Sequence, residues 1–206
     1  MIMKKLITIF TLALLFVSTS FAQDMKLGIK GGWNYANLDG RLAGLVNLSG
    51  DYVSGFHAGV YSTIGLNDNF AVQPELLFNQ FGTQQAIPGV TGNADITLSY
   101  VSVPVLLKYY VAPGLAVKGG PQLNILVDDQ IGLNVGDFNT QTDVLSDVVN
   151  MYNSTDFGVQ VGADYEFDFG LVLGANYYHG LTNVADIPLV DVGNRVVQLS
   201  VGWRLL

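Results

Sequence analysis

Residues 157–167 read Phe-Gly-Val-Gln-Val-Gly-Ala-Asp-Tyr-Glu-Phe, and this stretch decides the fold class. Every second residue, beginning with Phe157, is apolar or aromatic, and the residues between them are glycine or polar. This period of two places the apolar side chains on one face of a β-strand and the small or polar ones on the other. Similar stretches recur along the chain, so the sequence predicts an all-β protein built from amphipathic strands.

The beginning of the chain has the parts of a secretory signal peptide. An apolar run over residues 6–17 follows two lysines, and Ser20-Phe21-Ala22 places small residues at positions −3 and −1 of a cleavage site before Gln23. The apolar run is too short for a transmembrane helix, which needs about 20 residues. We therefore expect residues 1–22 to be a cleaved signal peptide and residues 23–206 to form one domain.

The composition indicates a membrane protein without membrane helices. Half of the residues are hydrophobic, 24 are glycine and only 13% are charged, which is about half of the charged fraction of soluble domains. There is no cysteine, so neither a lipidated cysteine nor a disulfide is available. Without Lys4 and Lys5, the chain has seven basic and 17 acidic residues. The resulting net charge of −10 argues against nucleic acid as a partner. An exported chain of this kind satisfies its backbone in lipid as a closed β-barrel, which places it in a bacterial outer membrane.

The alternation predicts eight strands, at residues 25–35, 52–63, 70–82, 97–110, 115–127, 155–167, 171–181 and 195–205. Their connections alternate in length: 36–51, 83–96, 128–154 and 182–194 are long, and 64–69, 111–114 and 168–170 are short. Outer-membrane barrels have an even number of strands, short periplasmic turns and long external loops. The sequence therefore predicts an eight-stranded antiparallel up-and-down transmembrane β-barrel with both termini in the periplasm.

The charged residues fall on the face that lipid would not meet. In the last strand, Val197 and Leu199 share the apolar face, whereas Gln198 and Arg204 share the other. A charge facing lipid at mid-depth would cost roughly 2–4 kcal/mol. Arg195 occupies one of the alternate strand positions that face lipid (the lipid-facing parity), and we place it at the external rim. Aromatic residues recur near the strand ends on the apolar face, as at the two membrane interfaces. This regular apolar face disfavours a soluble lipocalin-like barrel, whose apolar face points inward.

The interior of an eight-stranded barrel is only wide enough for its own side chains. We expect a structural network of eight charged residues to fill it: Lys26, Lys30, Glu75, Lys108, Lys118, Asp164, Glu166 and Arg204. Buried charges without partners are costly, so they are expected to pair, and Lys118 should meet Asp164. The sequence thus predicts a closed lumen, with a narrow porin-like channel as the alternative.

Residues suited to catalysis or metal binding are few. Of the two histidines, His57 is expected to face the lumen as a hydrogen-bonded residue, and His179 to lie near serines and threonines at the external rim. Nothing in the spacing supports a Ser-His pair, so we predict no enzyme; a barrel enzyme acting on lipid A is the alternative.

Several aspartates crowd the third long connection or its edge: Asp128, Asp129, Asp137, Asp143, Asp147 and Asp156. Their spacing does not match a calcium loop, so we interpret them as a solvated acidic loop and predict no metal and no cofactor. Apolar residues at helical spacing within 143–152 predict a short amphipathic helix in the same loop.

Five segments resemble the PorT-type outer-membrane β-barrel family: Gln73-Pro74-Glu75-Leu76-Leu77-Phe78, the run 100–110 (YVSVPVLLKYY), Gly119-Gly120-Pro121-Gln122, Asp156-Phe157-Gly158-Val159 and Gly180-Leu181-Thr182-Asn183. The resemblance covers the mature chain and implies an eight-stranded outer-membrane barrel. One member is associated with protein secretion, a role that we do not transfer. Such barrels usually end on an aromatic residue, whereas this chain ends on Leu205-Leu206.

With catalysis, a metal and an open pore disfavoured, the expected role is structural or interactive, carried by the external loops. The expected partners are outer-membrane lipid and either another envelope protein or an external ligand. We expect the barrel itself to be a monomer.

Overall fold

The computed structural model describes residues 25–42, 46–49, 51–86, 92–135, 138–143, 154–184 and 190–206. The expected signal peptide, residues 1–22, lies outside these ranges. The described part of the chain contains no apolar helix of membrane-crossing length.

The described residues form ten strands: β1 (Met25–Leu42), β2 (Val46–Ser49), β3 (Asp51–Gly65), β4 (Phe70–Ala86), β5 (Gly92–Ala112), β6 (Leu115–Val135), β7 (Phe138–Asp143), β8 (Thr155–Glu166), β9 (Leu171–Gly180) and β10 (Val190–Arg204). Eight of them close into an antiparallel barrel in the order β1-β3-β4-β5-β6-β8-β9-β10, because β10 also pairs with β1. β2 and β7 pair with the ends of β1 and β6. The predicted eight-stranded antiparallel barrel is confirmed, and each predicted strand corresponds to one barrel strand.

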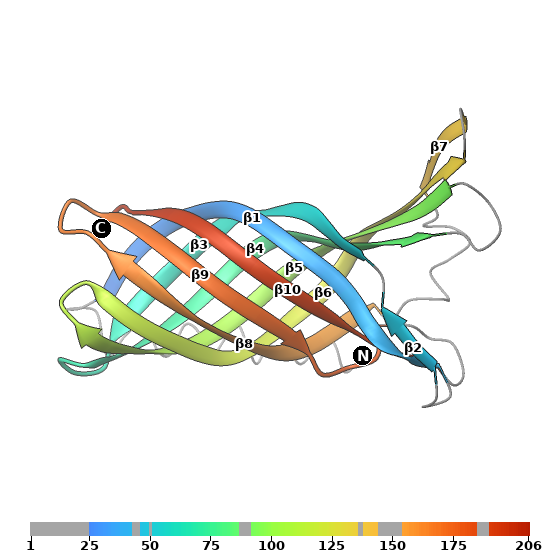
Figure 1. Ribbon diagram of the computed structural model, residues 1–206. Coiled ribbons are helices and arrows are strands. Elements are labelled where there is room, and N and C mark those ends of the chain that lie inside the picture. The colour runs from blue at the N-terminus through green and yellow to red at the C-terminus, as the bar shows by residue number, and fades with distance from the viewer. Residues whose placement is uncertain are drawn as a thin grey trace, which may run out of the picture.

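The barrel has two different ends (Figure 1). At one end, which we call the short-turn end, lie the tight connections β3–β4, β5–β6 and β8–β9, together with the C-terminus. At the other, the long-loop end, β2 lies and the β6–β7 hairpin projects well beyond the barrel. The predicted alternation of short and long connections therefore holds.

Much of what we expected to be irregular loop is strand. β4 and β5 remain paired as far as Ala86 and Asn93, inside the predicted loop 83–96, and β6 continues to Val135. The loop prediction is wrong for these segments because hydrophobic alternation marks only strands that have an apolar face to bury. Asp143 ends β7 rather than starting a helix, and the rest of the helix expected over 143–152 lies outside the described residues.

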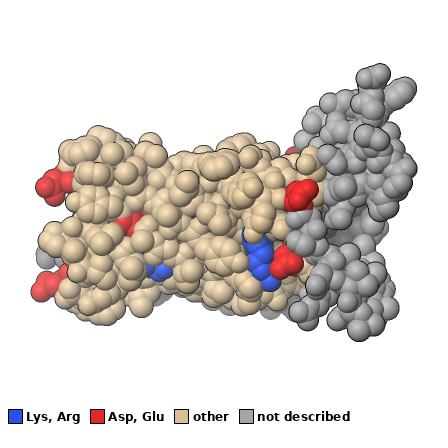
Figure 2. Space-filling model, in the orientation of Figure 1, with Lys and Arg blue, Asp and Glu red and all other residues tan. Residues whose placement is uncertain are grey.

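The outer wall carries the apolar residues of each strand. On β10 the exposed residues are Val197, Leu199, Val201 and Trp203, whereas Gln198 is buried. On the face seen in Figure 2, charged side chains gather near the two ends of the barrel and a charge-free band lies between them. The predicted outward direction of the apolar faces is confirmed.

Candidate functional site

The charged residues inside the barrel form one layer near the short-turn end. Lys118 Nζ lies 2.7 Å from Asp164 Oδ1 and 3.9 Å from Glu75 Oε1, while Lys108 Nζ lies 3.2 Å from Asp164 Oδ2. Lys30 pairs with the other oxygen of Glu75. These five side chains come from β1, β4, β5, β6 and β8, and all of them are buried. The ion pairs therefore run from wall to wall across the lumen.

Three further charges lie at the short-turn rim. Lys26 Nζ is 3.0 Å from Glu166 Oε1, and Arg204 pairs with the same carboxylate oxygen. Arg204 also donates to the backbone oxygen of Asp168 in the β8–β9 turn, at 3.1 Å. The structure thus brings together all eight charged residues expected in the lumen, as a buried group of five and a rim group of three. Five cations share three carboxylates, so the layer carries an excess of positive charge.

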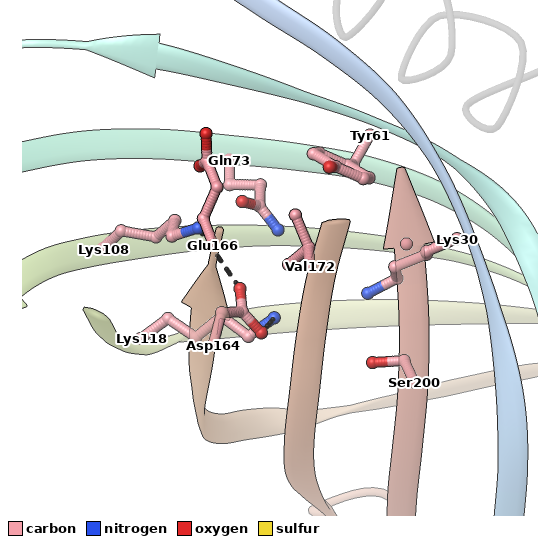
Figure 3. A pocket seen from close by; sticks show the side chains of 10 residues that line it. Lys30, Tyr61, Gln73, Lys108, Lys118, Asp164, Glu166, Val172 and Ser200 are labelled. Carbon is pink, nitrogen blue, oxygen red and sulfur yellow. Dashed lines mark ion pairs between the residues drawn. The ribbon is translucent and has the colours of Figure 1, made fainter. Parts of the chain in front are cut away.

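The space between these side chains is small. A cavity of about 10 Å³ is lined by Lys30, Tyr61, Gln73, Lys108, Lys118, Asp164 and Glu166, with Val172, Ser200 and Gly202. Figure 3 shows Lys108 and Lys118 reaching Asp164 from one side and Lys30 lying opposite. A cavity needs about 10–15 Å³ to hold one water molecule, so this space has room for one water at most.

A second layer, of amides and one histidine, fills the middle of the barrel. Gln198 Nε2 donates to Asn34 Oδ1 on the neighbouring strand β1 at 3.0 Å and, across the lumen, to Asn79 Oδ1 on β4 at 2.9 Å. His57 Nδ1 lies 2.8 Å from Asn34 Oδ1. His57 is buried, so its predicted place as a hydrogen-bonded lumen residue is confirmed.

The third layer, near the long-loop end, is apolar and aromatic, which the sequence analysis missed. Its buried members are Ala36, Phe81, Leu98, Tyr100, Tyr178, Val184 and Val196. The signal was present in the strand parity. Phe81 lies two residues beyond Asn79 and six beyond Glu75 in β4, so it shares their inward face. Strand alternation is the only signal that such inward apolar residues carry, because nothing in their chemistry excludes them from the lipid face.

Asp156 joins this layer to the β9–β10 connection. Tyr178 Oη, Asn124 Nδ2 and Asn194 Nδ2 donate to Asp156 Oδ2 at 2.9, 3.1 and 2.8 Å, and Thr182 Oγ1 donates to Oδ1 at 3.0 Å. The interpretation of Asp156 as part of a solvated acidic loop is wrong, because Asp156 has the inward parity of β8 and is fully buried.

The first residues after β9 consequently lie in the mouth of the barrel. Val184, two residues after Thr182, packs inside the apolar cluster, and its amide donates to Val192 O at 2.8 Å. We expected residues 182–194 to be an external loop. Residues 182–184 instead lie against the barrel interior, because Thr182 donates to Asp156 and Val184 is buried in the apolar cluster.

The described residues offer few means for catalysis or metal binding. His179 lies on the outer wall near the long-loop end, where its ring is 6.3 Å from that of Tyr177. Within the described ranges, no hydrogen bond joins His57 or His179 to a hydroxyl group, and no three His, Asp or Glu side chains are grouped to hold a metal ion. The described interior of the barrel consists of buried ion pairs, amides and apolar side chains.

Comparison with solved structures agrees with this architecture. Neisserial surface protein A shares 12% sequence identity with the chain at a TM-score of 0.54, covering 87% of this chain and 97% of its own. Ail of Yersinia pestis, solved in complex with the heparin analogue sucrose octasulfate, shares 14% identity at a TM-score of 0.49, covering 89% of this chain and 100% of its own. At these identities the likeness concerns the fold alone. No curated protein matches the sequence.

The sequence profile of the family described as outer membrane protein beta-barrel domain matches residues 21–186, well over half of the chain. The closed eight-stranded barrel, its apolar wall and this match agree with one another. The chain belongs to the outer membrane protein beta-barrel domain family.

Proposed function

We propose that this outer-membrane barrel is a membrane anchor with a closed lumen, and that it acts through the structures at its long-loop end. The observation that carries the proposal is the buried ion-pair layer that spans the lumen from Lys30 and Glu75 to Lys118, Asp164 and Lys108. A path for solutes would have to break these pairs and leave charges without partners, which is strongly unfavourable inside a protein.

The other two layers support a closed lumen independently. The amide layer joins strands across the barrel axis, and Val184 fills the mouth above it. A small solute would therefore meet three barriers of different chemistry in series. The charged residues have a structural role in this proposal, since they fill the lumen and satisfy one another.

The projecting strands support a role in contact with a partner outside the membrane. β4, β5, β6 and β7 continue as a paired sheet at the long-loop end (Figure 1). Paired strands are already ordered, so binding a partner costs them less conformational entropy than it would cost a free loop. Another envelope protein or an external ligand would meet this sheet, while the barrel sits in the membrane as a monomer.

We also propose that the protein is not an enzyme and belongs to the PorT-type group of its family. A nucleophile needs a base within hydrogen-bonding distance, and the surroundings of His57 and His179 are those of a lumen amide network and an exposed aromatic residue. The run 100–110 with its Val-Pro-Val-Leu-Leu-Lys-Tyr-Tyr sequence supports the PorT-type placement.

Planar-bilayer recording of the refolded protein tests the closed lumen. We expect no stable conductance steps from the wild type, in a bilayer where a general porin added as a positive control conducts. The Asp164→Asn/Glu166→Gln variant should likewise give no selective channel, because the amide and apolar layers remain. Reproducible wild-type steps of defined size would contradict the proposal.

Crosslinking in the native outer membrane tests the interaction role. Single cysteines in β7 and β2, carrying a photoactivatable crosslinker, should capture a defined partner that mass spectrometry identifies. A cysteine at Asp168 in the β8–β9 turn serves as the matched control. Equal capture of the same protein from both ends would contradict a role specific to the long-loop end.

A further inference from the structure

Arg195 differs from the other basic residues of the barrel. The structure describes the side chains of Lys26, Lys30, Lys108, Lys118, Arg195 and Arg204. Five of them contact a carboxylate within 4 Å. Among the described side chains, none supplies a carboxylate to Arg195, whose Nη1 donates to the backbone oxygens of Gly180 and Asn194, both at 3.0 Å. Its guanidinium therefore lacks the direct carboxylate contact that the other five described basic side chains make.

Arg195 lies on the outer wall, one step beyond a level marked by aromatic residues. It has the parity of Val197, which is exposed, and its cross-strand neighbours are His179 on β9 and Asn37 on β1. The next row toward the middle of the barrel consists of Tyr35, Val197 and Tyr177. Tyr35 also stacks on Tyr52, with the ring centroids 4.7 Å apart.

Aromatic residues of this kind occupy the membrane interface in outer-membrane barrels. Two residues add about 7 Å along a strand, which is roughly 5 Å along the membrane normal at the usual tilt of barrel strands. That distance brings Arg195 from the aromatic level into the layer of lipid headgroups at the long-loop end.

The Arg195 guanidinium is bound to the outer wall through only some of its N–H donors. A Cβ at position 193 would lie 2.9 Å from Arg195 Nη1 and 3.1 Å from Gly180 O, so glycine at this position leaves the space in which Nη1 reaches its two carbonyl acceptors. An arginine side chain has five N–H donors. Both of these bonds are made by Nη1, and among the described residues Nη2 and Nε have no hydrogen-bond acceptor.

We propose that Arg195, with His179 beside it, binds a phosphate group of a phosphorylated glycolipid in the outer leaflet of the outer membrane. A guanidinium matches phosphate through paired, charge-assisted hydrogen bonds. The apolar wall formed by Val197, Leu199 and Val201 lies directly below for the acyl chains. This site does not depend on whether the lumen is closed, so the two proposals can fail separately.

Native mass spectrometry of the refolded protein in detergent tests the site, with diphosphoryl lipid A, the same lipid A after removal of its phosphates, and phosphatidylglycerol as probes. We expect the wild type to bind diphosphoryl lipid A about tenfold or more tightly than the dephosphorylated form, as loss of a charge-assisted interaction implies. Arg195→Gln should abolish this difference, and Arg195→Lys should retain part of it.

Two further variants complete the test. Arg204→Gln removes an arginine at the opposite end whose charge Glu166 neutralises, so it should keep the wild-type preference. Gly193→Ala keeps the charge of Arg195 but displaces its guanidinium, so it should weaken lipid A binding. The heat-dependent mobility shift of folded barrels in gel electrophoresis verifies folding for each variant.

Three results would overturn the proposal. The first is an undiminished preference for diphosphoryl lipid A in folded Arg195→Gln or Gly193→Ala. The second is tighter binding of phosphatidylglycerol than of diphosphoryl lipid A. The third is displacement of bound lipid A by millimolar inorganic phosphate, which would indicate a site for a soluble anion.

Discussion

At the scale of single residues, Asp164 is the carboxylate that pairs with two buried lysines of the lumen. It accepts Lys118 at 2.7 Å and Lys108 at 3.2 Å, in a layer where cations already outnumber carboxylates. Replacing it with Asn leaves buried Lys108 without a carboxylate partner and Lys118 with only the more distant Glu75, so Asp164→Asn should destabilise the barrel by about 3–5 kcal/mol. Urea unfolding in lipid vesicles, followed by tryptophan fluorescence, measures the change.

Lys108→Gln is the matched control for this prediction. It removes one cation of the excess and leaves Asp164 paired with Lys118. It should therefore cost much less than Asp164→Asn. Equal losses from the two variants would mean that packing volume rather than charge balance sets the stability of this layer.

Parity explains which lumen residues could be predicted. Lys30, Glu75, Lys118 and Asp164 were identifiable because a charge clear of a strand end has no favourable place in lipid. Leu77, Phe81 and Leu98 are buried inside the barrel with the same inward parity, yet nothing in their chemistry forbids the lipid face. The burial of Asp156 depends on donors from β6, β9, β10 and Thr182, and such convergence appears only once the barrel is closed.

At the scale of elements, the β5–β6 turn depends on one glycine. Gly114 has φ of 75°, and a Cβ there would lie 2.5 Å from Glu166 O. A non-glycine residue in this left-handed region costs roughly 1–2 kcal/mol, and the clash with the backbone adds to it. Gly114→Ala should therefore lower the free energy of unfolding by at least that amount, as measured by urea titration.

Gly119→Ala provides the comparison, since a Cβ at this position on β6 would make only ordinary contacts at 3.5 Å with Gln160 O and Val161 Cγ1. Alanine there should leave stability close to wild type. A loss at Gly119 as large as that at Gly114 would show that adding a methyl group destabilises this part of the barrel in general, and that turn geometry is not the cause.

The positions of the strands were predictable from the sequence, whereas the distance to which they extend at the long-loop end was not. Between Phe70 and Phe78, alternate residues face lipid or lumen, so the sequence must alternate. From Gln84 to Ala86 the strand keeps its pairing with Asp95, Ala94 and Asn93, but a strand beyond the apolar wall has no lipid to meet. Backbone pairing continues there without a hydrophobic signal.

At the scale of the whole molecule, the two ends of the barrel should face different compartments. The C-terminus and the three short turns share one end, and β2 and β7 lie at the other (Figure 1). Long, projecting segments of outer-membrane barrels face the exterior, and tight turns face the periplasm. The chain has no cysteine, so single cysteines introduced at Asn47, Asn134 and Asp168 report orientation against an unreactive background.

A membrane-impermeant maleimide applied to intact cells should label cysteines at positions 47 and 134 and spare position 168 until the cells are permeabilised. Labelling of position 168 alone on intact cells would show that the barrel has the opposite orientation. Reversal would also turn the outer wall around Arg195 toward the inner leaflet, where glycolipid phosphates are absent, and would place the β6–β7 hairpin in the periplasm. One labelling pattern thus decides whether the phosphate site and the display of the projecting sheet stand on the side of the membrane that each requires.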